Sequence, residues 1–399
     1  MTANARLGAA LALLAGAWQP ATSAAQEATI LPEDGGLVRF GSEDRGLSLS
    51  PLVQFDVGDA WGDAAGLNDG GEDPWRLVRL YARGSYGDAS LKLAYDFQDE
   101  DAPWTYAAVS YALTDDWSLT FGQTDEPFLL EDASSTPYLP FAESAPTAAL
   151  GTGNNIGLVA SRAGSRSSFG IGVYGGNLGE GLSSGGTAIT ARVTIAPIYA
   201  ESAHNGAGPR RLLHLGASAS ARRDVGGALA FSDEGGSSLI DAPLVDAPGL
   251  DAEDVGRIGL EYAQVVGRLT IEAEAVGAWV EGQGEDSFAH GAYVQALWSL
   301  TAEQRAYDPG SGRFGRVTPV RPVGGGGRGA WQVGARLGHL DLSNLGPEAG
   351  AVRRASLVAN AYLTRRLALS LDLSQSRVTD GPNDGEDAAA LTLRGQVAF

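Results

Sequence analysis

The chain has 399 residues, 44% of them hydrophobic and 56 of them glycine, and it contains no cysteine. This composition argues against a disulfide-stapled domain, a cysteine-based zinc module and a disordered chain, and the lack of a run of about 18 apolar residues beyond the first twenty positions argues against a helical membrane protein. The formal net charge of -20 disfavours nucleic acid as a partner, because phosphate binding needs clustered lysine and arginine.

The first 25 residues have the composition of an export signal. Arg6 supplies a positive charge, and residues 7–18 form an apolar core that is too short to cross a bilayer. Small residues follow and end at a suitable cleavage site after Ala25. The same stretch would fit a short buried helix of a cytosolic domain, but the lack of cysteine and the pattern downstream favour export. We therefore predict a signal peptide over residues 1–25.

The chain from residue 47 to residue 399 consists of segments in which hydrophobic residues recur at every second position. In residues 367–374 leucine occupies every odd-numbered position, and Ala, Ser and Asp occupy the even-numbered ones, which is typical of a β-strand. The same alternation recurs at 47–55, 90–98, 190–195, 269–275, 331–337 and 391–399. With aromatic residues near strand ends, it predicts an all-β, transmembrane antiparallel β-barrel over 47–399, preceded by an N-terminal lead-in over 26–46.

The connectors between these segments alternate between long and short, as expected if the first strand starts in the periplasm. Fifteen connectors join sixteen predicted strands, and bacterial single-chain barrels have an even number of strands. Long connectors lie at 57–74, 124–153 and 223–254, and short turns lie at 87–88, 114–116, 266–267 and 364–366. The connector at 301–329 is long although it falls on the periplasmic side, so we expect it to cover the mouth or to fold into the pore.

Several motifs resemble those of the phosphate-selective porin O and P family. They lie at 122–131, 134–136, 140–143, 153–157, 213–218, 300–305, 315–319, 329–331 and 340–342. The resemblance runs from the first strand to Phe399. It implies a homotrimeric outer-membrane channel of about sixteen strands, with loop three, the long loop after strand five, folded into the lumen to narrow it.

The final segment agrees with this reading of the sequence. Phe399 is in phase with Val397, Leu393 and Leu391, and such a terminal aromatic strand is typical of proteins delivered to the outer-membrane assembly machinery. We predict that Phe399 serves assembly and that the protein resides in the bacterial outer membrane, in contact with membrane lipid and lipopolysaccharide.

The basic residues depart from the pattern of the family. Asp125 stands where the family usually carries a lysine, and residues 228–234 lack the arginine ladder that would guide anions inward. The four connectors at 57–74, 124–153, 223–254 and 378–387 hold 22 acidic residues and one arginine. A basic segment on the periplasmic side contains Arg305, Arg313, Arg316, Arg321 and Arg328.

Alternation along the strands assigns the remaining charges to the lumen. The predicted pore-lining bases are Arg79, Arg83, Lys92, Arg192 and Arg336, with Arg394 also inward, and the inward acids are Asp96, Glu261, Glu272, Glu274 and Asp372. We predict that the bases form a constriction opposite Asp125, Glu126, Glu131 and Asp132 of loop three. The alternative is that these charges only solvate a wet lumen and pair with one another.

The sequence predicts no catalytic site, no cofactor and no metal site. The four histidines, His204, His214, His290 and His339, are far apart in sequence and lack metal-binding spacing. The glycine runs at 151–153 and 324–327 do not have the context of a phosphate-binding loop. Acidic stretches at 68–73 and 380–387 miss the EF-hand register.

The function best supported by the sequence is a water-filled passive diffusion channel for small ions and solutes, with weak ion selectivity. The first alternative is an anion-selective or phosphate-selective porin. Two alternatives of another class are an adhesion or structural barrel, whose acidic loops would bind lipopolysaccharide through divalent cations, and an enzyme with a hydrolase site at the rim, for which His290 and Asp286 are the candidates.

Overall fold

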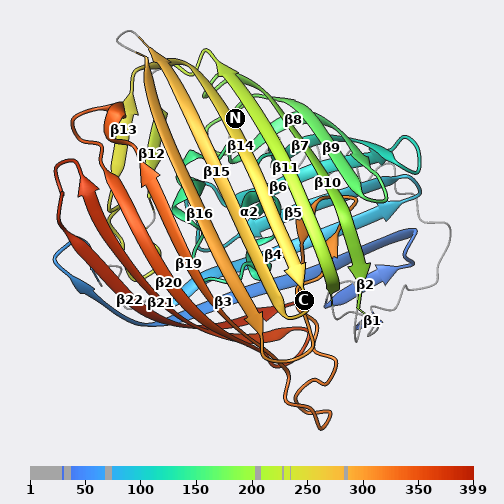
Figure 1. Ribbon diagram of the computed structural model, residues 1–399. Coiled ribbons are helices and arrows are strands. Elements are labelled where there is room, and N and C mark those ends of the chain that lie inside the picture. The colour runs from blue at the N-terminus through green and yellow to red at the C-terminus, as the bar shows by residue number, and fades with distance from the viewer. Residues whose placement is uncertain are drawn as a thin grey trace.

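A closed antiparallel β-barrel makes up most of the computed structural model, which describes residues 29–30, 37–67, 74–202, 208–226, 229–233, 235–282 and 286–399 (Figure 1). The predicted signal peptide lies outside the described residues. Eighteen strands form the main sheet, and without β1 and β2 the remaining sixteen close into the barrel through the pairing of β22 with β3. The prediction of a sixteen-stranded all-β barrel is confirmed.

The barrel strands include the predicted segments, but several run further: residues 57–62, predicted as the start of a loop, continue the first strand. The barrel strands are β3 (Arg45–Gly62), β4 (Trp75–Tyr86), β5 (Ala89–Asp96), β6 (Trp104–Ala112), β7 (Trp117–Asp125), β8 (Asn154–Ala163), β9 (Ser167–Tyr174), β10 (Thr187–Glu201), β11 (Pro209–Arg223), β14 (Ala252–Val266), β15 (Leu269–Gly282), β16 (Ser287–Ser299), β19 (Ala330–Asp341), β20 (Ala351–Tyr362), β21 (Leu367–Asp380) and β22 (Asp387–Ala398). The strands differ in length: β5 to β9 have 8 to 10 residues, whereas β10 to β22 within the barrel have 12 to 15.

The seam of the barrel uses a strand that the sequence did not predict. β22 pairs with β3 only from Leu52 to Gly62, so the first residues of β3 would present an unpaired edge. Part of that edge pairs with β2 (Val38–Gly41), which lies in the predicted lead-in, and β2 pairs in turn with β1 (Thr29–Ile30). Covering an open edge in this way removes a site where another chain could pair.

The two ends of the barrel differ, and aromatic residues mark both. Short turns join most strands at one end of the barrel, which we call the turn end. The connectors at the other end, which we call the loop end, are longer. Exposed aromatic side chains near the loop end are Trp61, Trp75, Phe97, Trp279 and Phe288, and those near the turn end are Tyr86, Tyr111, Trp117, Trp298 and Trp331. The odd-numbered leucines of β21 are exposed between these rings, as expected of a face that contacts lipid.

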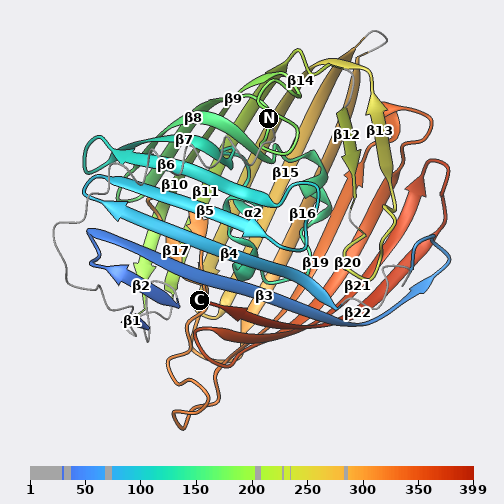
Figure 2. The ribbon, with the colours of Figure 1, turned by 180° about the vertical axis from the view of Figure 1, so that it is seen from behind.

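Two loops and part of a turn-end insert pack inside the barrel (Figure 2). Loop three, residues 126–153, contains α2 (Leu130–Ala133), η1 (Thr136–Tyr138) and η2 (Pro146–Leu150). Loop five, residues 224–251, contains the hairpin of β12 (Leu229–Ser232) and β13 (Asp246–Leu250). The turn-end insert, residues 300–329, contains β17 (Tyr307–Asp308) and β18 (Arg313–Phe314), and η3 (Ser343–Leu345) lies in a loop-end connector. Among the described residues no helix is long and apolar enough to cross a bilayer.

The largest apolar cluster lies in the loop-end half of the lumen, where loop five meets loop three. Phe231, Ile240 and Leu244 of loop five belong to the same buried cluster as Phe128 and Leu150 of loop three. Burial of a large apolar side chain contributes about 1.5–3 kcal/mol, so this contact holds both loops inside the barrel. The sequence predicted an acidic outer loop at 223–254, and the reason for the difference is the apolar content of residues 229–250, which favours burial over solvation.

Candidate pore lining and constriction

The charges that the sequence assigned to the lumen face inward, and most of them are neutralised by a partner. Eight of these side chains point inward and are buried: Asp96, Arg192, Glu261, Glu272, Glu274, Arg336, Asp372 and Arg394. Arg79 binds Asp96 on the neighbouring strand at 3.0 Å, and Arg305 of the insert binds Glu272 at 2.6 Å. A buried charge is tolerated when it is paired and hydrogen-bonded. These ion pairs therefore neutralise much of the charge on the inner face of the barrel.

Loop three is attached to the opposite wall through Glu131. Arg336 of β19 lies 3.3 Å from the Glu131 carboxylate, and the backbone N–H of Ala145 donates to the other carboxylate oxygen at 2.9 Å. The backbone N–H groups of Leu130 and Glu131 donate to the Glu274 carboxylate of β15. One predicted opposition, Glu131 with Arg336, is therefore present as a direct ion pair.

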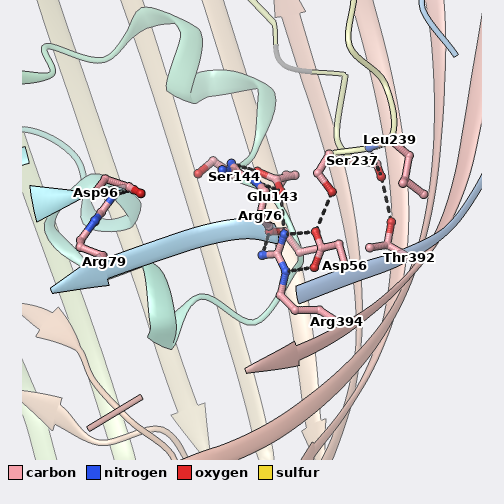
Figure 3. Close-up of polar contacts among 12 residues, drawn as sticks. Asp56, Arg76, Arg79, Asp96, Glu143, Ser144, Ser237, Leu239, Thr392 and Arg394 are labelled. Atoms are coloured by element: carbon pink, nitrogen blue, oxygen red, sulfur yellow. Dashed lines mark hydrogen bonds and ion pairs between the residues drawn. The ribbon is translucent and has the colours of Figure 1, made fainter. Parts of the chain in front are cut away.

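A second attachment of loop three forms a cluster of four charged side chains (Figure 3). Arg394 of β22 donates to both oxygens of Asp56 at 2.7 Å and to Glu143 at 2.8 Å. Arg76 of β4 donates to both oxygens of Glu143 at 2.9 and 2.8 Å. Burial alone would raise the pKa of Glu143, but Arg76 and Arg394 together lower that pKa to about 2. Glu143 is thus ionised at any physiological pH and fixes the tip of loop three.

Arg192 does not pair with loop three, contrary to the prediction. Its guanidinium donates to both carboxylate oxygens of Glu261 at 2.7 and 2.8 Å and to the backbone oxygen of Gly312 in the insert at 2.7 Å. His214 contacts Glu261 at 3.0 Å and the Tyr307 hydroxyl at 2.6 Å. The pairing differs because Arg192 on β10 and Glu261 on β14 both lie next to β11, so they meet across one strand. This cluster holds the insert against the wall.

Glu126 has a partner that the sequence did not suggest. Arg222 of β11 binds its carboxylate, and the Thr190 hydroxyl donates to the same group. The alternation that assigned Arg192 to the lumen also places Arg222 on the inner face of its strand. Alternation along β11 could therefore have identified Arg222 as a lumen residue.

Loop five contributes further contacts that the sequence missed. Arg354 of β20 binds Asp233, the Ser238 hydroxyl donates to Asp56 at 2.6 Å, and the hydroxyls of Ser237 and Thr392 lie 2.8 Å apart (Figure 3). These contacts lie on β20, β3 and β22, so loop five crosses the lumen from its origin between β11 and β14. An acidic outer loop was predicted here because phase along a strand says nothing about where a connector folds.

The predicted basic segment is divided by the structure into an inner and an outer part. Arg305 is buried, and Arg313 and Arg316 line a cavity inside the barrel, whereas Arg321 and Arg328 are exposed at the turn end. The segment that contains Arg321 and Arg328 projects below the barrel in Figure 1.

A cavity of about 140 Å³ remains between loop three, the insert and the wall formed by β3 to β8. Its basic lining residues are Arg79, Arg83, Lys92, Arg313 and Arg316, and its acidic ones are Asp125 and Asp132. Arg83 is exposed to this space and donates only to the Ser50 hydroxyl at 3.3 Å among described side chains. Lys92 lies 3.4 Å from the centre of the Tyr106 ring. We refer to this space as the basic cavity.

The remaining predicted residues lie at the edges of this arrangement. Phe399 follows β22 and borders the basic cavity, and the Arg366 guanidinium lies 4.6 Å from the centre of its ring. The role of Phe399 in assembly stays a prediction. His290 contacts Phe288 and His339.

Comparison with known proteins adds a family and a set of similar folds. Residues 50–399 match the family described as phosphate-selective porin O and P. An uncharacterized protein of Caulobacter vibrioides is 27% identical over 342 residues, covering 79% of this chain and 65% of that protein. The chain thus spans about two thirds of the length of that relative.

Three solved structures illustrate the similarity of fold. An anion-selective porin of Comamonas acidovorans has a TM-score of 0.53 and 15% identity, with 88% of this chain and 99% of that chain covered. A loop-deletion mutant of the outer membrane protein OmpT of Vibrio cholerae has a TM-score of 0.54 and 8% identity, covering 90% and 100%. The outer membrane channel DcaP of Acinetobacter baumannii has a TM-score of 0.52 and 13% identity, covering 90% and 99%.

Proposed function

Because this chain belongs to the phosphate-selective porin O and P family, we propose that it forms a passive diffusion channel for small ions and solutes in the bacterial outer membrane. The observation that carries this proposal is the closed barrel. Its outer surface is apolar and has aromatic residues near both ends, and its charged interior retains a cavity. We take the loop end to face outward and the turn end to face the periplasm. A homotrimer is part of the proposal, supported by the trimer form of the structurally similar OmpT.

The proposed route for ions runs through the basic cavity, beside loop three. Glu126, Glu131 and Glu143 of loop three form ion pairs with arginines. The arginines neutralise these negative charges, so the three carboxylates contribute little to the field in the lumen. The basic cavity has five cationic and two acidic lining residues. Fixed charges at a constriction select which ions pass. The sequence alone favoured weak selectivity, and this balance of charges supports the alternative, a preference for anions.

The test of this proposal removes Arg83 and Lys92, two strand cations of the basic cavity for which the described structure shows no ion pair with a carboxylate. We expect the double substitution Arg83→Ala and Lys92→Ala to lower the chloride-to-potassium permeability ratio severalfold, because the local concentration of anions falls with the positive charge. The measurement is the reversal potential of purified channels in a potassium chloride gradient. Arg321→Ala, which removes an exposed charge outside the lumen, is the control, and an unchanged ratio in the double variant would reject the proposed route.

The same cavity should respond to pH through Asp132. Its half-buried carboxyl belongs to α2 of loop three and borders the cavity, and burial together with the negative charges of Glu131 and Asp125 raises its pKa to about 8. Asp132 is therefore mostly neutral at pH 7 and becomes negative as the pH rises above 8. We expect the preference for anions to fall between pH 7 and pH 9.5, and we expect Asp132→Asn to make that fall smaller. An identical pH profile in the variant would contradict this assignment.

A further inference from the structure

A group of metal-ligand side chains lies on the outer face of the barrel, near the loop end and away from the lumen. His290 is on β16, and His339 and Asp341 are on β19, the adjacent strand at the front of Figure 1. One ligand atom from each residue lies within 4.8 Å of the others. We propose that these three residues bind a zinc ion. This proposal is independent of the channel function.

The antiparallel register explains why three residues far apart in sequence meet. His290 is directly opposite Asp341, and His339 is opposite Ala292, two positions further along the same face. Directly opposed and diagonal positions on one face of a sheet are close enough for long side chains to touch. The sequence predicted no metal site because histidine spacing along the chain does not reveal pairing across strands.

The hydrogen bonds of each side chain leave a ligand atom available. Nδ1 of His339 lies 3.1 Å from the backbone oxygen of Val352. Since a carbonyl oxygen only accepts, Nδ1 carries the proton and Nε2 keeps its lone pair, which is the arrangement that commonly orients a metal-binding histidine. Oδ1 of Asp341 accepts from the backbone and the hydroxyl of Ser343 at 3.0 and 2.6 Å, and among the described residues Oδ2 accepts none.

The position of the His290 ring is fixed by aromatic neighbours. The Phe288 ring is stacked on it, with 5.7 Å between centres and 8° between planes, and the His339 ring meets it edge-on at 5.8 Å. The regular pairing of the two strands and the stacked Phe288 ring hold the three side chains in position without a metal. Binding therefore requires little further ordering of these side chains.

Two imidazole nitrogens and one carboxylate oxygen are a ligand set that zinc prefers, with water as the fourth ligand. Ligand atoms about 2.1 Å from a tetrahedral zinc ion are about 3.4 Å apart. The observed limit of 4.8 Å thus requires only a small rotation of the side chains. A bound ion would join the loop ends of β16 and β19 and should stabilise that part of the wall.

One neighbouring charge opposes a cation at this site and provides a sharp test. Arg353 of β20 is directly opposite His339 on the outer face and is exposed, and Arg377 is opposite Arg353 on β21. Removing the positive charge nearest to the site should strengthen zinc binding, because like charges repel. A nonspecific association with acidic loops would not depend on this arginine.

The experiment is a calorimetric titration of zinc chloride into the folded, detergent-solubilised full chain, prepared without a histidine tag and stripped with a chelator. We expect one zinc per chain and a rise in the melting temperature when zinc is added. The double variant His290→Ala with His339→Ala should weaken binding by about 100-fold or more and abolish the rise in melting temperature, and Asp341→Asn should weaken binding by about tenfold. Arg353→Gln should strengthen it severalfold.

The control is Asp380→Asn, which removes an exposed carboxylate at the same end of the barrel and should leave zinc affinity unchanged. Heat-modifiable migration on a gel shows that each variant has folded. Unchanged zinc binding in the folded double histidine variant would overturn the proposal, as would an absence of binding to the parent chain. Channel conductance is not a readout here, so failure of this proposal and failure of the channel proposal are distinguishable.

Discussion

Excision of residues 230–249 should raise the single-channel conductance severalfold. The described residues of this range pack in the loop-end half of the lumen, where Phe231, Ile240 and Leu244 meet loop three. An apolar constriction excludes water and ions, so its removal widens the wettable path. Leu229 and Leu250 are paired across the β12–β13 hairpin, so a short glycine-serine turn can join them without disturbing β11 or β14.

The matched control is excision of 382–385, a mostly exposed stretch of another loop-end connector, which should leave conductance unchanged. Planar-bilayer recordings give the conductance, and gel mobility before and after heating shows that the barrel is folded. A folded excision variant with the parent's conductance would mean that loop five does not limit the flow of ions.

Replacing Arg394 by Ala should produce the largest loss of stability of any single substitution in the lumen. It leaves Asp56 without the guanidinium that donates to both its oxygens and removes one of two arginines from Glu143. Removing one partner of a buried ion pair costs about 3–5 kcal/mol, because the remaining charge stays buried. We expect a clearly lower unfolding temperature and a noisier current, since the tip of loop three loses an attachment.

Combined substitutions separate lost charge pairing from lost packing. Arg394→Met together with Asp56→Asn and Glu143→Gln leaves Arg76 as the remaining charge of the cluster and should recover part of the stability. Arg394→Lys should recover less than half, because an ammonium group cannot donate to two carboxylates in the same forked geometry. Equal unfolding temperatures for Arg394→Ala and the parent would show that the cluster does not stabilise the barrel.

Strand positions could be predicted from the sequence because each strand separates lipid from water. The leucines of β21 alternate with Ala, Ser and Asp for that reason, and the same alternation placed Arg336 and Glu274 in the lumen. Phase along a strand fixes the side of the sheet on which a residue lies, so the inward charges were predicted correctly.

The partners of those charges could not be predicted in the same way. Arg192 was expected to face loop three, but it binds Glu261 two strands away, and the choice between them depends on the three-dimensional course of loop three. The inward fold of loop five was missed for a related reason. Phe231 and Ile240 indicate burial, but an apolar connector of a barrel can pack in the lumen, on a rim or on another chain.

The unequal strand lengths have a consequence for the membrane around the barrel. A strand of eight residues at about 3.3 Å per residue and a tilt of about 45° rises about 19 Å, whereas the apolar band of outer-membrane barrels is about 25 Å tall. With 8 to 10 residues each, β5 to β9 rise about 19–23 Å, so the lipid beside this wall would have to thin at a cost for each ångström of hydrophobic mismatch. A neighbouring chain carries no such cost, so we expect subunits of the proposed trimer to meet at this short wall.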